Sequence, residues 1–369
     1  MNLSKKIGIL GGGQLGKMLC EAASPMHLNL HILDRDKNFP AAWSCPRFHL
    51  GDFTNYDDVM TFAKDMDIVS IELENAGKTV IPSSSVVRTI RDKGIQKNFY
   101  KQHGLDTSPF TLYDDRHGVW TAIMNEEITY PFVQKARRDG YDGRGVSVIR
   151  SEEDLTDLMD VPCLVEDMVY IYKELAIMVA RNPSGDITTF PLVEMEFDEK
   201  ANLVNDLVCP AEVSISIDER ATSLAIDLAE KIELTGLLAI ELFLTQDGDL
   251  IINEVAPRPH NSGHHTIEAC NYSQYDIHIR CLLDLPLPEI SLLRPAGMMN
   301  LLGSADHSGA PKIVGLHHIF ETADAYLHWY GKPETRPNRK MGHVTVLGDN
   351  LTAVREKLAK LSHEVNITS

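Results

Sequence analysis

The chain has 369 residues, a formal net charge of −18 at pH 7 and 43% hydrophobic residues, so we expect two or three domains rather than a single core. The acidic balance argues against nucleic-acid binding, and no apolar run is long enough to span a membrane. The N-terminus leads into a strand pattern rather than a signal peptide, and the six cysteines form no C-x-x-C pair, so a cytoplasmic protein with reduced thiols is expected.

The first 90 residues alternate between strand and helix patterns. Short apolar runs read as buried strands, and polar or glycine-rich loops follow their ends. This alternation predicts a doubly wound parallel sheet, an α/β fold in which ligands bind at the carboxyl ends of the strands. The predicted elements are strands over residues 6–10, 28–33 and 67–73 and a helix over residues 17–24.

A glycine motif follows the first predicted strand. Gly11, Gly13 and Gly16 have the spacing G-x-G-x-x-G, and Asp34 closes the second strand, which satisfies the fingerprint of dinucleotide-binding proteins. The mechanism is more general, because glycines admit any phosphate to the free N–H groups at the start of a helix. The motif therefore predicts a phosphorylated ligand, with NAD, FAD and a purely structural turn as alternatives.

A second glycine-rich loop, residues 140–146, lies between two predicted strands and follows Lys135. It lacks the P-loop spacing, but glycines let the backbone close over phosphates and a lysine neutralises their charge. A flexible hairpin with a solvated lysine is the alternative. The surrounding predicted elements are helices over residues 94–103 and 219–234, strands over residues 131–135, 146–150 and 163–166, and antiparallel strands between residues 175 and 193.

Two apolar runs flank Asp247-Gly248, a strong turn dipeptide, and predict a β-hairpin. If these two residues form the turn, Gln246 pairs with Asp249 and Glu241 lies opposite Glu254. Facing carboxylates repel each other on a sheet, and Mg²⁺ between them would reverse that effect. Asn253 adds a neutral oxygen, although its side chain is expected on the other face. Two surface carboxylates on an ordinary hairpin are the alternative.

Two polar loops follow the hairpin. Residues 256–265 combine arginine, histidine, asparagine and serine with two prolines, which favours a preorganised binding loop. A zinc site at His260, His264 and His265 is the alternative, but adjacent side chains diverge. Residues 336–343 form a basic loop suited to phosphate, or a solvated charge run. The remaining predicted elements are a helix over residues 273–283, a boundary at residues 284–288, a mixed segment from residue 291 and a closing helix over residues 350–362.

Six motifs occur together in order through the chain: GGGQLG at 11–16, IELEN at 71–75, GYDGRG at 140–145, AIELF at 239–243, INEVAPRPHNSGH at 252–264 and RKMGHV at 339–344. With this ordered set the chain resembles the N5-carboxyaminoimidazole ribonucleotide synthetases, which are ATP-grasp carboxylases of purine biosynthesis. The resemblance implies an ATP-grasp fold with an N-terminal doubly wound domain (residues 1–92), an ATP-grasp domain (93–290, with a lid at about 108–165) and a small C-terminal domain (291–369).

The resemblance also implies a reaction. Such enzymes use ATP and Mg²⁺ to activate bicarbonate, with carboxyphosphate as the expected intermediate, and the exocyclic amine of 5-aminoimidazole ribonucleotide captures the carboxyl group. Family members are commonly homodimers that pass their unstable product to a mutase. Rival readings are a nicotinamide-dependent oxidoreductase, a non-catalytic purine-nucleotide sensor, and an ATP-grasp ligase with another acceptor, such as a formate-using glycinamide ribonucleotide ligase.

Site residues carry over by position. The expected ATP ligands are Lys93, Lys135, Gly140, Tyr141, Asp142, Gly143, Arg144, Gly145, Val146, Glu166, Asp167, Met168, Val169, Glu174, Asn253 and Glu254. Glu166 to Val169 would offer backbone groups to the base edge, and Glu174 would bind ribose hydroxyls. Glu241 and Glu254 would hold Mg²⁺. The expected catalytic residues are Tyr141, Arg144, Arg258 and His264, and the expected substrate ligands are Gln14, Leu15, Glu74, Asn261, Ser262, Arg339 and Lys340.

Three positions depart from the family pattern. Lys93 stands where arginine is usual, which keeps the charge but loses the bidentate fork. Asp139 replaces a glycine beside the 140–146 loop, and Met195 to Phe197 replaces a polar segment that normally ends in a histidine. These changes bear on nucleotide affinity and leave the metal and acceptor motifs intact.

Overall fold

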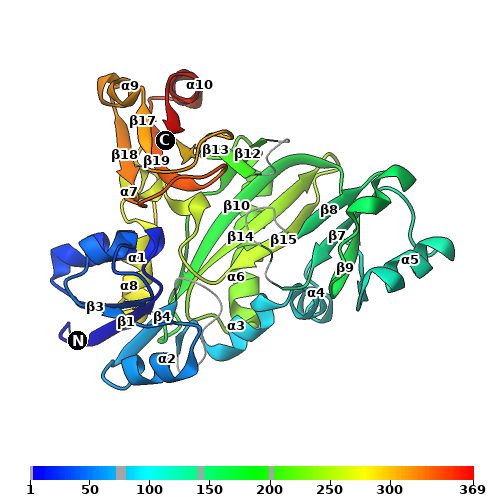
Figure 1. Ribbon diagram of the computed structural model, residues 1–369, viewed down its shortest axis with the longest axis horizontal. Coiled ribbons are helices and arrows are strands. Elements are labelled where there is room, and N and C mark those ends of the chain that lie inside the picture. The colour runs from blue at the N-terminus through cyan, green and yellow to red at the C-terminus, as the bar shows by residue number, and fades with distance from the viewer. Residues whose placement is uncertain (1–2, 72–79, 139, 141–144, 199–202) are drawn as a thin grey trace.

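The computed structural model describes residues 3–71, 80–138, 140, 145–198 and 203–369 (Figure 1). These residues form a five-stranded sheet near the N-terminus, a four-stranded sheet, a nine-stranded sheet through the middle of the molecule and a two-stranded sheet near the C-terminus. The expected α/β class is confirmed. In the part of the chain that the structure describes, no helix is long and apolar enough to cross a membrane.

The N-terminal sheet is parallel throughout, with strand order β3-β2-β1-β4-β5, as predicted. Helix α1 begins at Gln14 rather than at the predicted Lys17, with Gly13 as its N-cap, so the end of the glycine motif is already helical. The short strand β3 was not predicted. The elements are β1 (Lys6–Leu10), α1 (Gln14–Ala23), η1 (Ser24–Met26), β2 (Asn29–Asp34), η2 (Pro40–Trp43), β3 (Phe48–Leu50), α2 (Tyr56–Ala63), β4 (Ile68–Ile71), β5 (Val80–Ile81) and α3 (Ser84–Arg91).

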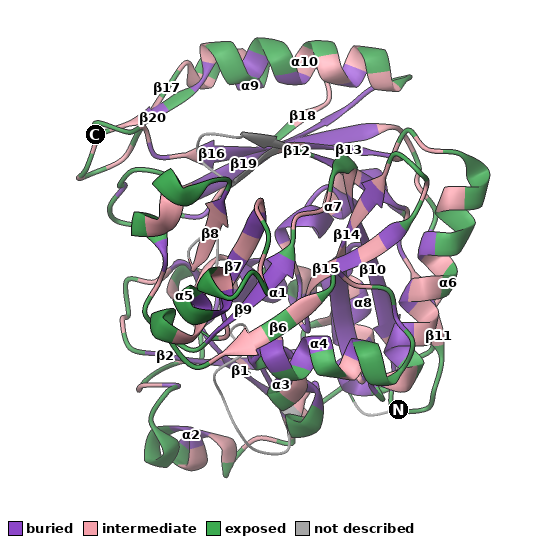
Figure 2. Cartoon of the chain, turned by 90° about the vertical axis from the view of Figure 1, so that its right-hand side faces the viewer, coloured by how far each residue is buried: buried purple, intermediate pink, exposed green. Residues whose placement is uncertain are grey.

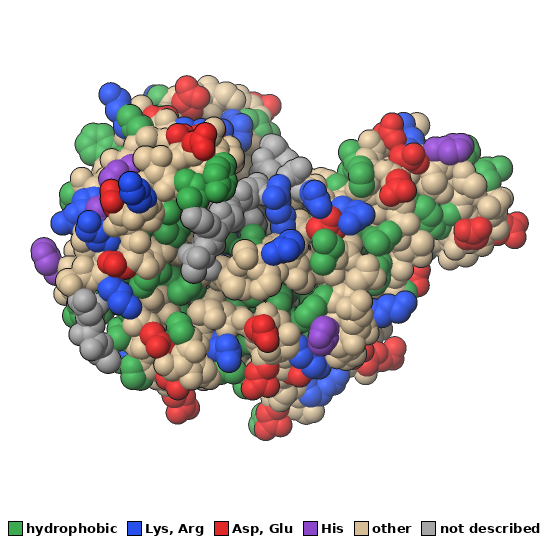
Figure 3. All heavy atoms as spheres, turned by 90° about the horizontal axis from the view of Figure 1, so that it is seen from below, with side chains coloured by type: hydrophobic (Ala, Val, Ile, Leu, Met, Phe, Trp, Pro, Cys, Tyr) green, Lys and Arg blue, Asp and Glu red, His purple; other side chains and the backbone are tan. Residues whose placement is uncertain are grey.

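A four-stranded antiparallel sheet, in the order β6-β9-β7-β8, forms the lid that projects from the body of the molecule (Figure 3). Its own small core contains Val119, Phe132 and Ile149. Helix α4 (Lys93–Gln102) precedes it. The lid elements are β6 (Phe110–Tyr113), α5 (Arg116–Met124), β7 (Phe132–Ala136), β8 (Val146–Ile149), η3 (Glu152–Asp157) and β9 (Cys163–Asp167).

The nine-stranded sheet carries the largest core. Strands β10 and β14 are buried along most of their length, and helix α6 covers one face through Ala221, Ala225 and Leu228 (Figure 2). The antiparallel strands predicted between residues 175 and 193 are confirmed. The elements are β10 (Ile171–Arg181), β11 (Ile187–Thr189), β12 (Val193–Asp198), β13 (Leu203–Cys209), α6 (Ile215–Lys231), β14 (Gly236–Thr245), β15 (Leu250–Ala256), η4 (Asn261–Gly263), α7 (Thr266–Ala269) and α8 (Gln274–Leu283).

The C-terminal segment continues this sheet, because β16 pairs with β13. It also folds back on the N-terminal domain. Tyr330 is buried in the same cluster as Met18 and Leu19 of α1, and Lys17 Nζ donates to the Trp329 carbonyl at 2.5 Å. The remaining elements are β16 (Ala296–Leu302), β17 (Lys312–Val314), α9 (Leu316–Glu321), β18 (Ala325–Trp329), β19 (Lys340–Leu347), α10 (Leu351–Glu364) and β20 (Asn366–Thr368).

Asp92 joins the lid to α4. Its carboxylate caps the helix by accepting from the Gly94 and Ile95 backbone at 3.0 and 3.2 Å. It also accepts from Arg137 Nε and Arg138 Nε at 2.9 and 3.0 Å, just beyond β7. Burial alone would raise the pKa of Asp92, but the hydrogen bonds from Arg137, Ile95 and Arg138 hold it below its ordinary value. The ionised carboxylate therefore stabilises this junction.

We expect Asp92→Ala to lower the free energy of unfolding by about 3 kcal/mol, because it leaves two arginines and a helix N-terminus without their buried partner. Urea unfolding at pH 7, followed by circular dichroism, measures this loss, with the exposed lid residue Asp114→Ala as the control. Since the folded-state pKa of Asp92 is lowered, its contribution is present above the unfolded pKa and is lost as the pH falls through the folded pKa. A variant as stable as the wild type at pH 7 would contradict the assignment.

Candidate active site

The hairpin of β14 and β15 is closed by three residues, Gln246 to Gly248. Thr245 N donates to the Asp249 carbonyl at 3.0 Å, and Gly248 has φ 86°. The predicted pairing of Gln246 with Asp249 is therefore wrong, because the loop is one residue longer than a two-residue turn. Leu244 lies opposite Leu250, which shifts the register near the turn by one residue.

A β-bulge restores the register further along the strands. Leu242 lies opposite Ile252, but Glu241 lies opposite Glu254, so Asn253 is an extra residue in β15. The predicted pairing of the two glutamates is confirmed, although two deviations from the simple hairpin produce it. Ile252 and Val255 both pack in the core beneath α6. Asn253 and Glu254 therefore share the opposite face, and the expectation that Asn253 points away from Glu254 is wrong.

Three carboxylates gather on this face. Burial, with the neighbouring Glu254 and Glu174, raises the pKa of Glu241 to about 8. Burial also raises the pKa of Glu174 to about 7. In Glu254, burial would raise the pKa, but the ammonium of Lys93 lowers it below its ordinary value. Without a cation, Glu241 therefore holds its proton while Glu254 stays ionised.

The donors of this cluster fit Mg²⁺. Glu241 and Glu254 supply carboxylate oxygens, and Asn253 supplies an amide oxygen, which is the chemistry that magnesium prefers together with phosphate oxygens. The pKa of Glu241 is raised mainly by burial and additionally by the charges of Glu254 and Glu174. A divalent cation would offset these charges, because its charge reverses the effect of each nearby carboxylate.

Three lysines line or support the same cleft. Lys93 forms an ion pair with Glu254. Lys135 Nζ lies 2.7 Å from Glu166 Oε2 and donates to Asn253 Oδ1 at 2.9 Å. Lys97 Nζ lies 2.5 Å from the other oxygen of Glu166. These ammonium groups provide positive charge near Glu241 and Glu254, as a triphosphate would need.

The glycine-rich loop is closed at its base. The Ala136 N–H donates to the Gly145 carbonyl at 2.8 Å, and Gly145 has φ 74°. A side chain at Gly145 would contact Ala136 and Gly140, so the two arms are in close contact there. Val146 lies opposite Lys135 in the register of β7 and β8. The last residue of the loop therefore lies opposite Lys135, the lysine that was expected to neutralise phosphate.

Asp167, Met168 and Val169 lie where the lid sheet passes into the central sheet. Asp167 ends β9, and β10 begins at Ile171. Met168 and Val169 are half-buried between the two sheets. Their expected contact with a nucleotide base stays a prediction, and this location at the junction of the two sheets is compatible with it.

The glycine motif of the N-terminal domain faces the C-terminal segment. Lys332 Nζ donates to Gln14 Oε1 at 2.8 Å and to the Lys340 carbonyl at 2.5 Å. The expected approach of the 336–343 segment to the motif is therefore present. Burial is the main influence on the pKa of Glu241, which it raises, and of His264, which it lowers, and the charge of Lys340 is a smaller influence on both. Lys340 is therefore close enough to interact with both groups.

Asp34 is occupied within the protein. Its carboxylate is 2% exposed and accepts from the Gly12 N–H at 2.5 Å and the Arg35 N–H at 2.7 Å. In dinucleotide-binding proteins this acidic residue binds a ribose hydroxyl. A carboxylate used to hold the glycine loop has little capacity left for that contact, which argues against NAD or FAD.

The loop after the hairpin is largely buried. His260 Nε2 lies 3.7 Å from Glu241 Oε1, and Ser262 Oγ lies 2.9 Å from His260 Nδ1. Both side-chain polar atoms of Asn261 are buried and lack a hydrogen-bond partner. An unpartnered buried amide is costly, and a bound substrate would satisfy it. Arg258 Nη1 donates to the Pro259 carbonyl at 3.2 Å.

His264 is fully buried, with Gln274 Nε2 and Tyr275 Oη at 3.0 and 3.2 Å from its Nδ1. Burial holds its pKa well below the ordinary value, so the imidazole is neutral, and its buried Nε2 has no hydrogen-bond partner. The expected catalytic role of His264 stays a prediction. The zinc alternative is not favoured. Among the described residues, the group of three that could share a metal is His317, His318 and Glu321 on α9.

Several expected site residues lie outside the described part of the chain. They are Glu74, Tyr141, Asp142, Gly143, Arg144 and the departure at Asp139. The side chain of Phe197 is likewise outside the described features, whereas Met195 is buried opposite Glu174. Leu15 is buried at the start of α1, and Arg339 lies beside Arg336.

Three residues that contact expected site residues were not themselves predicted as ligands: Lys97, His260 and Lys332. Lys97 lies one helical turn after Lys93, a spacing that indicates a shared helix face. His260 was considered only as part of a zinc site. Nothing in the local sequence of Lys332 separates it from a solvated lysine, so only the tertiary structure reveals its contact with Gln14.

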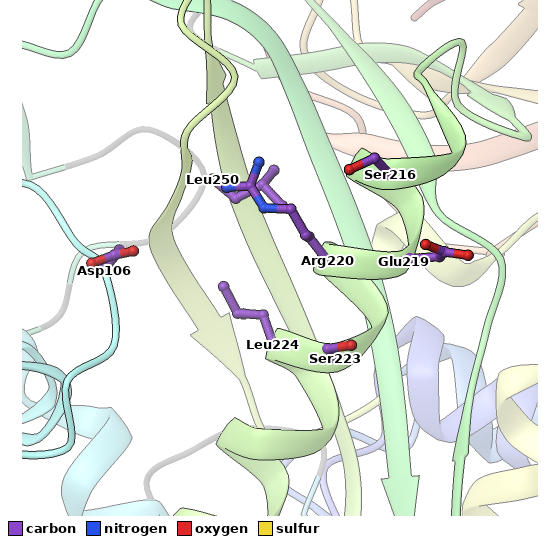
Figure 4. A pocket seen from close by; sticks show the side chains of 7 residues that line it. All are labelled: Asp106, Ser216, Glu219, Arg220, Ser223, Leu224 and Leu250. Carbon is purple, nitrogen blue, oxygen red and sulfur yellow. The ribbon is translucent and has the colours of Figure 1, made fainter.

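A separate cavity of about 410 Å³ lies beside α6 (Figure 4). Figure 4 shows Ser216, Ser223 and Leu224 on α6, with Arg220 beside Leu250 of β15. Arg220 Nη1 donates to the Gly248 carbonyl at 2.8 Å and so supports the hairpin turn. Leu250 packs in the core beneath α6, on the face of the hairpin that does not carry the glutamates. This cavity therefore does not belong to the candidate site.

Three family models match the chain. They are the ribonucleotide synthetase preATP-grasp domain over residues 4–90, the ATP-grasp domain over residues 98–275 and the phosphoribosylaminoimidazole carboxylase C-terminal domain over residues 296–357. The first match contains the glycine motif. The second contains both the lid and the hairpin, and the third contains Lys332 and Lys340.

Known relatives match almost the whole chain. It is 33% identical to N5-carboxyaminoimidazole ribonucleotide synthase of Bacillus subtilis, over 92% of this chain and 91% of the relative. It is 36% identical to chloroplastic phosphoribosylaminoimidazole carboxylase of Vigna aconitifolia, over 96% of this chain. The chain spans only about two thirds of the length of the phosphoribosylaminoimidazole carboxylases. It covers 66% of the protein from Vigna aconitifolia, 67% of that from Saccharomyces cerevisiae and 66% of that from Schizosaccharomyces pombe.

A solved structure shows the same similarity. N5-carboxyaminoimidazole synthase of Aspergillus clavatus, in complex with ADP and 5-aminoimidazole ribonucleotide, has a TM-score of 0.88 and 29% identity. The match covers 98% of this chain and 99% of that one. The similarity therefore extends over all four sheets.

We expect Glu254→Gln to abolish divalent-metal binding, because one of the two facing carboxylates loses its charge while its volume is kept. Titration of Mn²⁺ as a spin-active substitute for Mg²⁺, in the presence of ADP, measures the loss. We do not expect the variant to be more stable without metal, since Glu254 is paired with Lys93 and its removal leaves that ammonium unpartnered. Mn²⁺ affinity equal to that of the wild type, or wild-type turnover in excess chelator, would show that the pair holds no metal.

Proposed function

Because the chain belongs to the family of N5-carboxyaminoimidazole ribonucleotide synthases, we propose that it is an ATP-grasp ligase that carboxylates 5-aminoimidazole ribonucleotide. The reaction consumes ATP and bicarbonate and forms N5-carboxyaminoimidazole ribonucleotide, ADP and phosphate, a step of purine biosynthesis. The observation that carries the proposal is the bulged hairpin, which faces Glu241, Asn253 and Glu254 toward Lys93 and Lys135.

The residues of the cleft suit phosphoryl transfer. Such a reaction needs positioning and charge neutralisation more than covalent chemistry. Lys135 and the loop from Gly140 would hold the triphosphate, and Glu174 would bind the ribose. When bound at Glu241 and Glu254, Mg²⁺ would neutralise charge on the phosphates. Lys93, which replaces the usual arginine, keeps a positive charge beside Glu254.

Bicarbonate is a weak nucleophile and needs activation, which transfer of the γ-phosphoryl group supplies by forming carboxyphosphate and ADP. The amine of the acceptor then attacks the carboxyl carbon, and phosphate leaves. Arg258 or Arg144 would steady the anionic intermediate, and Tyr141 would contact bicarbonate or the aminoimidazole. Because carboxyphosphate hydrolyses readily, the 140–146 loop would have to exclude water when the lid closes.

The acceptor would lie between the N-terminal domain and the C-terminal segment. Its phosphate would be held by the start of α1 at Gln14 and Leu15, opposite Arg339 and Lys340. Burial and the neighbouring Arg336 lower the pKa of Arg339, which indicates crowded positive charge suited to an anion. Glu74, Asn261 and Ser262 would contact the rest of the ribonucleotide.

Further features of the proposal come from the family. We keep the domain division after residues 92 and 290, a homodimeric state and transfer of the unstable product to a mutase. A cytoplasmic location also stays a proposal, since one relative of this chain is a chloroplastic enzyme.

ADP release tests the proposal most simply. ATP, bicarbonate and 5-aminoimidazole ribonucleotide are each omitted in turn, and full ADP release should need all three. An oxidoreductase would instead respond to NADH, and a nucleotide sensor would bind ATP without turnover. Formate-dependent ADP release with glycinamide ribonucleotide would identify a ligase with another acceptor and would overturn the proposal.

We expect Gly13→Val to weaken binding of the aminoimidazole ribonucleotide and to leave ADP affinity unchanged. Gly13 has extended backbone dihedral angles (φ −75°, ψ −153°), which valine also adopts, so the variant should fold and fill space needed by the phosphate. Equilibrium titration of each ligand measures the effect. The opposite pattern, with ADP binding lost and acceptor binding normal, would mean that the two ligand sites are assigned backwards.

Lys340→Ala should cost about 1.5–3 kcal/mol in acceptor binding, the range for a hydrogen bond to a charged group. ADP affinity should barely change, and Lys360→Ala on the exposed surface of α10 serves as the control. Titration calorimetry with the ribonucleotide measures the loss. If Lys340→Ala leaves acceptor affinity unaltered and weakens Mn²⁺ or ADP binding, the prediction is wrong. Lys340 would then act on the proposed metal and nucleotide site and not on the acceptor.

A further inference from the structure

We infer that Lys97 is a positioning residue of the nucleotide site: its ammonium fixes the Glu166 carboxylate beside Lys135 and ties the lid to the hairpin that carries Asn253 and Glu254. This inference rests on the nucleotide site proposed above. It goes further by giving a function to a buried charge that does not line the open cleft.

The burial of Lys97 is the first observation. Its side chain is 2% exposed, and that of its partner Glu166 is 3% exposed. Removing an ammonium and a carboxylate from water is expensive, and an apolar pair of similar size would often be as stable. A buried ion pair beside a binding cleft therefore indicates a positional role rather than a stabilising one.

Glu166 is shared between two lysines. Lys97 Nζ lies 2.5 Å from Oε1, and Lys135 Nζ lies 2.7 Å from Oε2. Lys135 also donates to Asn253 Oδ1 at 2.9 Å. Lys97 occupies one oxygen of Glu166, so only the other oxygen is available to Lys135. Lys135 therefore stays directed toward Asn253. Without Lys97, both oxygens of Glu166 would compete for Lys135 and draw it away from the hairpin.

Thr107 connects Lys97 to the hairpin. Lys97 Nζ donates to Thr107 Oγ1 at 2.6 Å, and that hydroxyl donates to the Ile252 carbonyl at 2.9 Å. The Ile252 N–H in turn donates to the Asp106 carbonyl at 2.9 Å. Ile252 directly precedes the bulged residue Asn253. Lys97 thus links three parts of the molecule: α4, strand β9 of the lid and strand β15 of the central sheet.

The charge of Lys97 depends on its surroundings. Burial, together with the charges of Lys135 and Lys93, lowers the pKa of Lys97 to about 8. The carboxylate of Glu166 acts in the opposite direction. Lys93 lies on the same helix face and is paired with Glu254. The ammonium is therefore charged at neutral pH and loses its proton as the pH rises through about 8. Its hold on Glu166 should weaken over the same pH range.

The test compares Lys97→Met with Lys97→Arg and with Lys101→Met, an exposed lysine at the end of the same helix. Binding of Mg-ADP is measured by titration calorimetry between pH 6.5 and 9.5. Lys97→Met should weaken binding roughly 10- to 100-fold, as loss of supporting partners typically does at metal sites. Lys97→Arg should keep most of the affinity, and Lys101→Met should match the wild type.

The pH profile separates positioning from a merely structural role. Over the range in which Lys97 loses its proton, wild-type affinity should fall relative to that of Lys97→Arg, because arginine stays charged while Glu241 and Glu174 titrate in both proteins. If Lys97→Met fails to fold, Thr107→Val breaks the link to the Ile252 carbonyl without removing the charge, and it should also weaken Mg-ADP binding. Wild-type affinity in Thr107→Val, together with a pH profile of Lys97→Arg that is identical to that of the wild type, would overturn the inference. Failure of the wild type to bind Mg-ADP would instead remove the proposed function.

Discussion

Crowded negative charge on one face of a bulged hairpin is the constraint from which the rest of the site follows. Asn253 is an extra residue in β15, and it brings Asn253 and Glu254 to the same face as Glu241. A regular hairpin would direct one of the two toward the core beneath α6, where a charge could not be tolerated. The bulge thus creates a cluster of buried oxygen atoms on one face, where burial first and the neighbouring Glu254 and Glu174 second raise the pKa of Glu241 to about 8. The proposed cation would allow all of these carboxylates to ionise together.

The lysines are arranged around this constraint. Lys93 compensates Glu254 directly, and Lys135 reaches Asn253 while it is held by Glu166. The cations come from α4 and the lid, and the carboxylates come from the central sheet. The contacts between these parts therefore bring opposite charges together, and the proposed triphosphate would complete the compensation. The Asp92 junction with Arg137 and Arg138 lies outside the cleft and ties the same two parts.

The sequence predicted the parallel N-terminal sheet and the helices α1, α4, α6, α8 and α10, because local periodicity and glycine positions determine them, but it missed the shorter helices α2, α3, α5, α7 and α9 of the described residues. It also predicted that Glu241 faces Glu254, but by assuming a two-residue turn and no bulge, two errors that cancel. Turn length and bulges depend on packing against α6, which a local pattern does not contain. Lys97 and Lys332 were missed for a related reason, since each resembles a surface lysine until its distant partners Glu166 and Gln14 are known. The burial of His264 likewise depends on Gln274 and Tyr275 from α8.

The central claim is that ATP activates bicarbonate in this cleft before the acceptor amine reacts. The most direct measurement uses bicarbonate labelled with ¹⁸O, together with ATP and 5-aminoimidazole ribonucleotide, and follows the label by ³¹P nuclear magnetic resonance of the released phosphate. If carboxyphosphate forms, an oxygen of bicarbonate remains on phosphorus, and the phosphate should carry ¹⁸O in proportion to turnover. Unlabelled phosphate released together with carboxylated product would contradict the account, because ATP would then have activated a group other than bicarbonate.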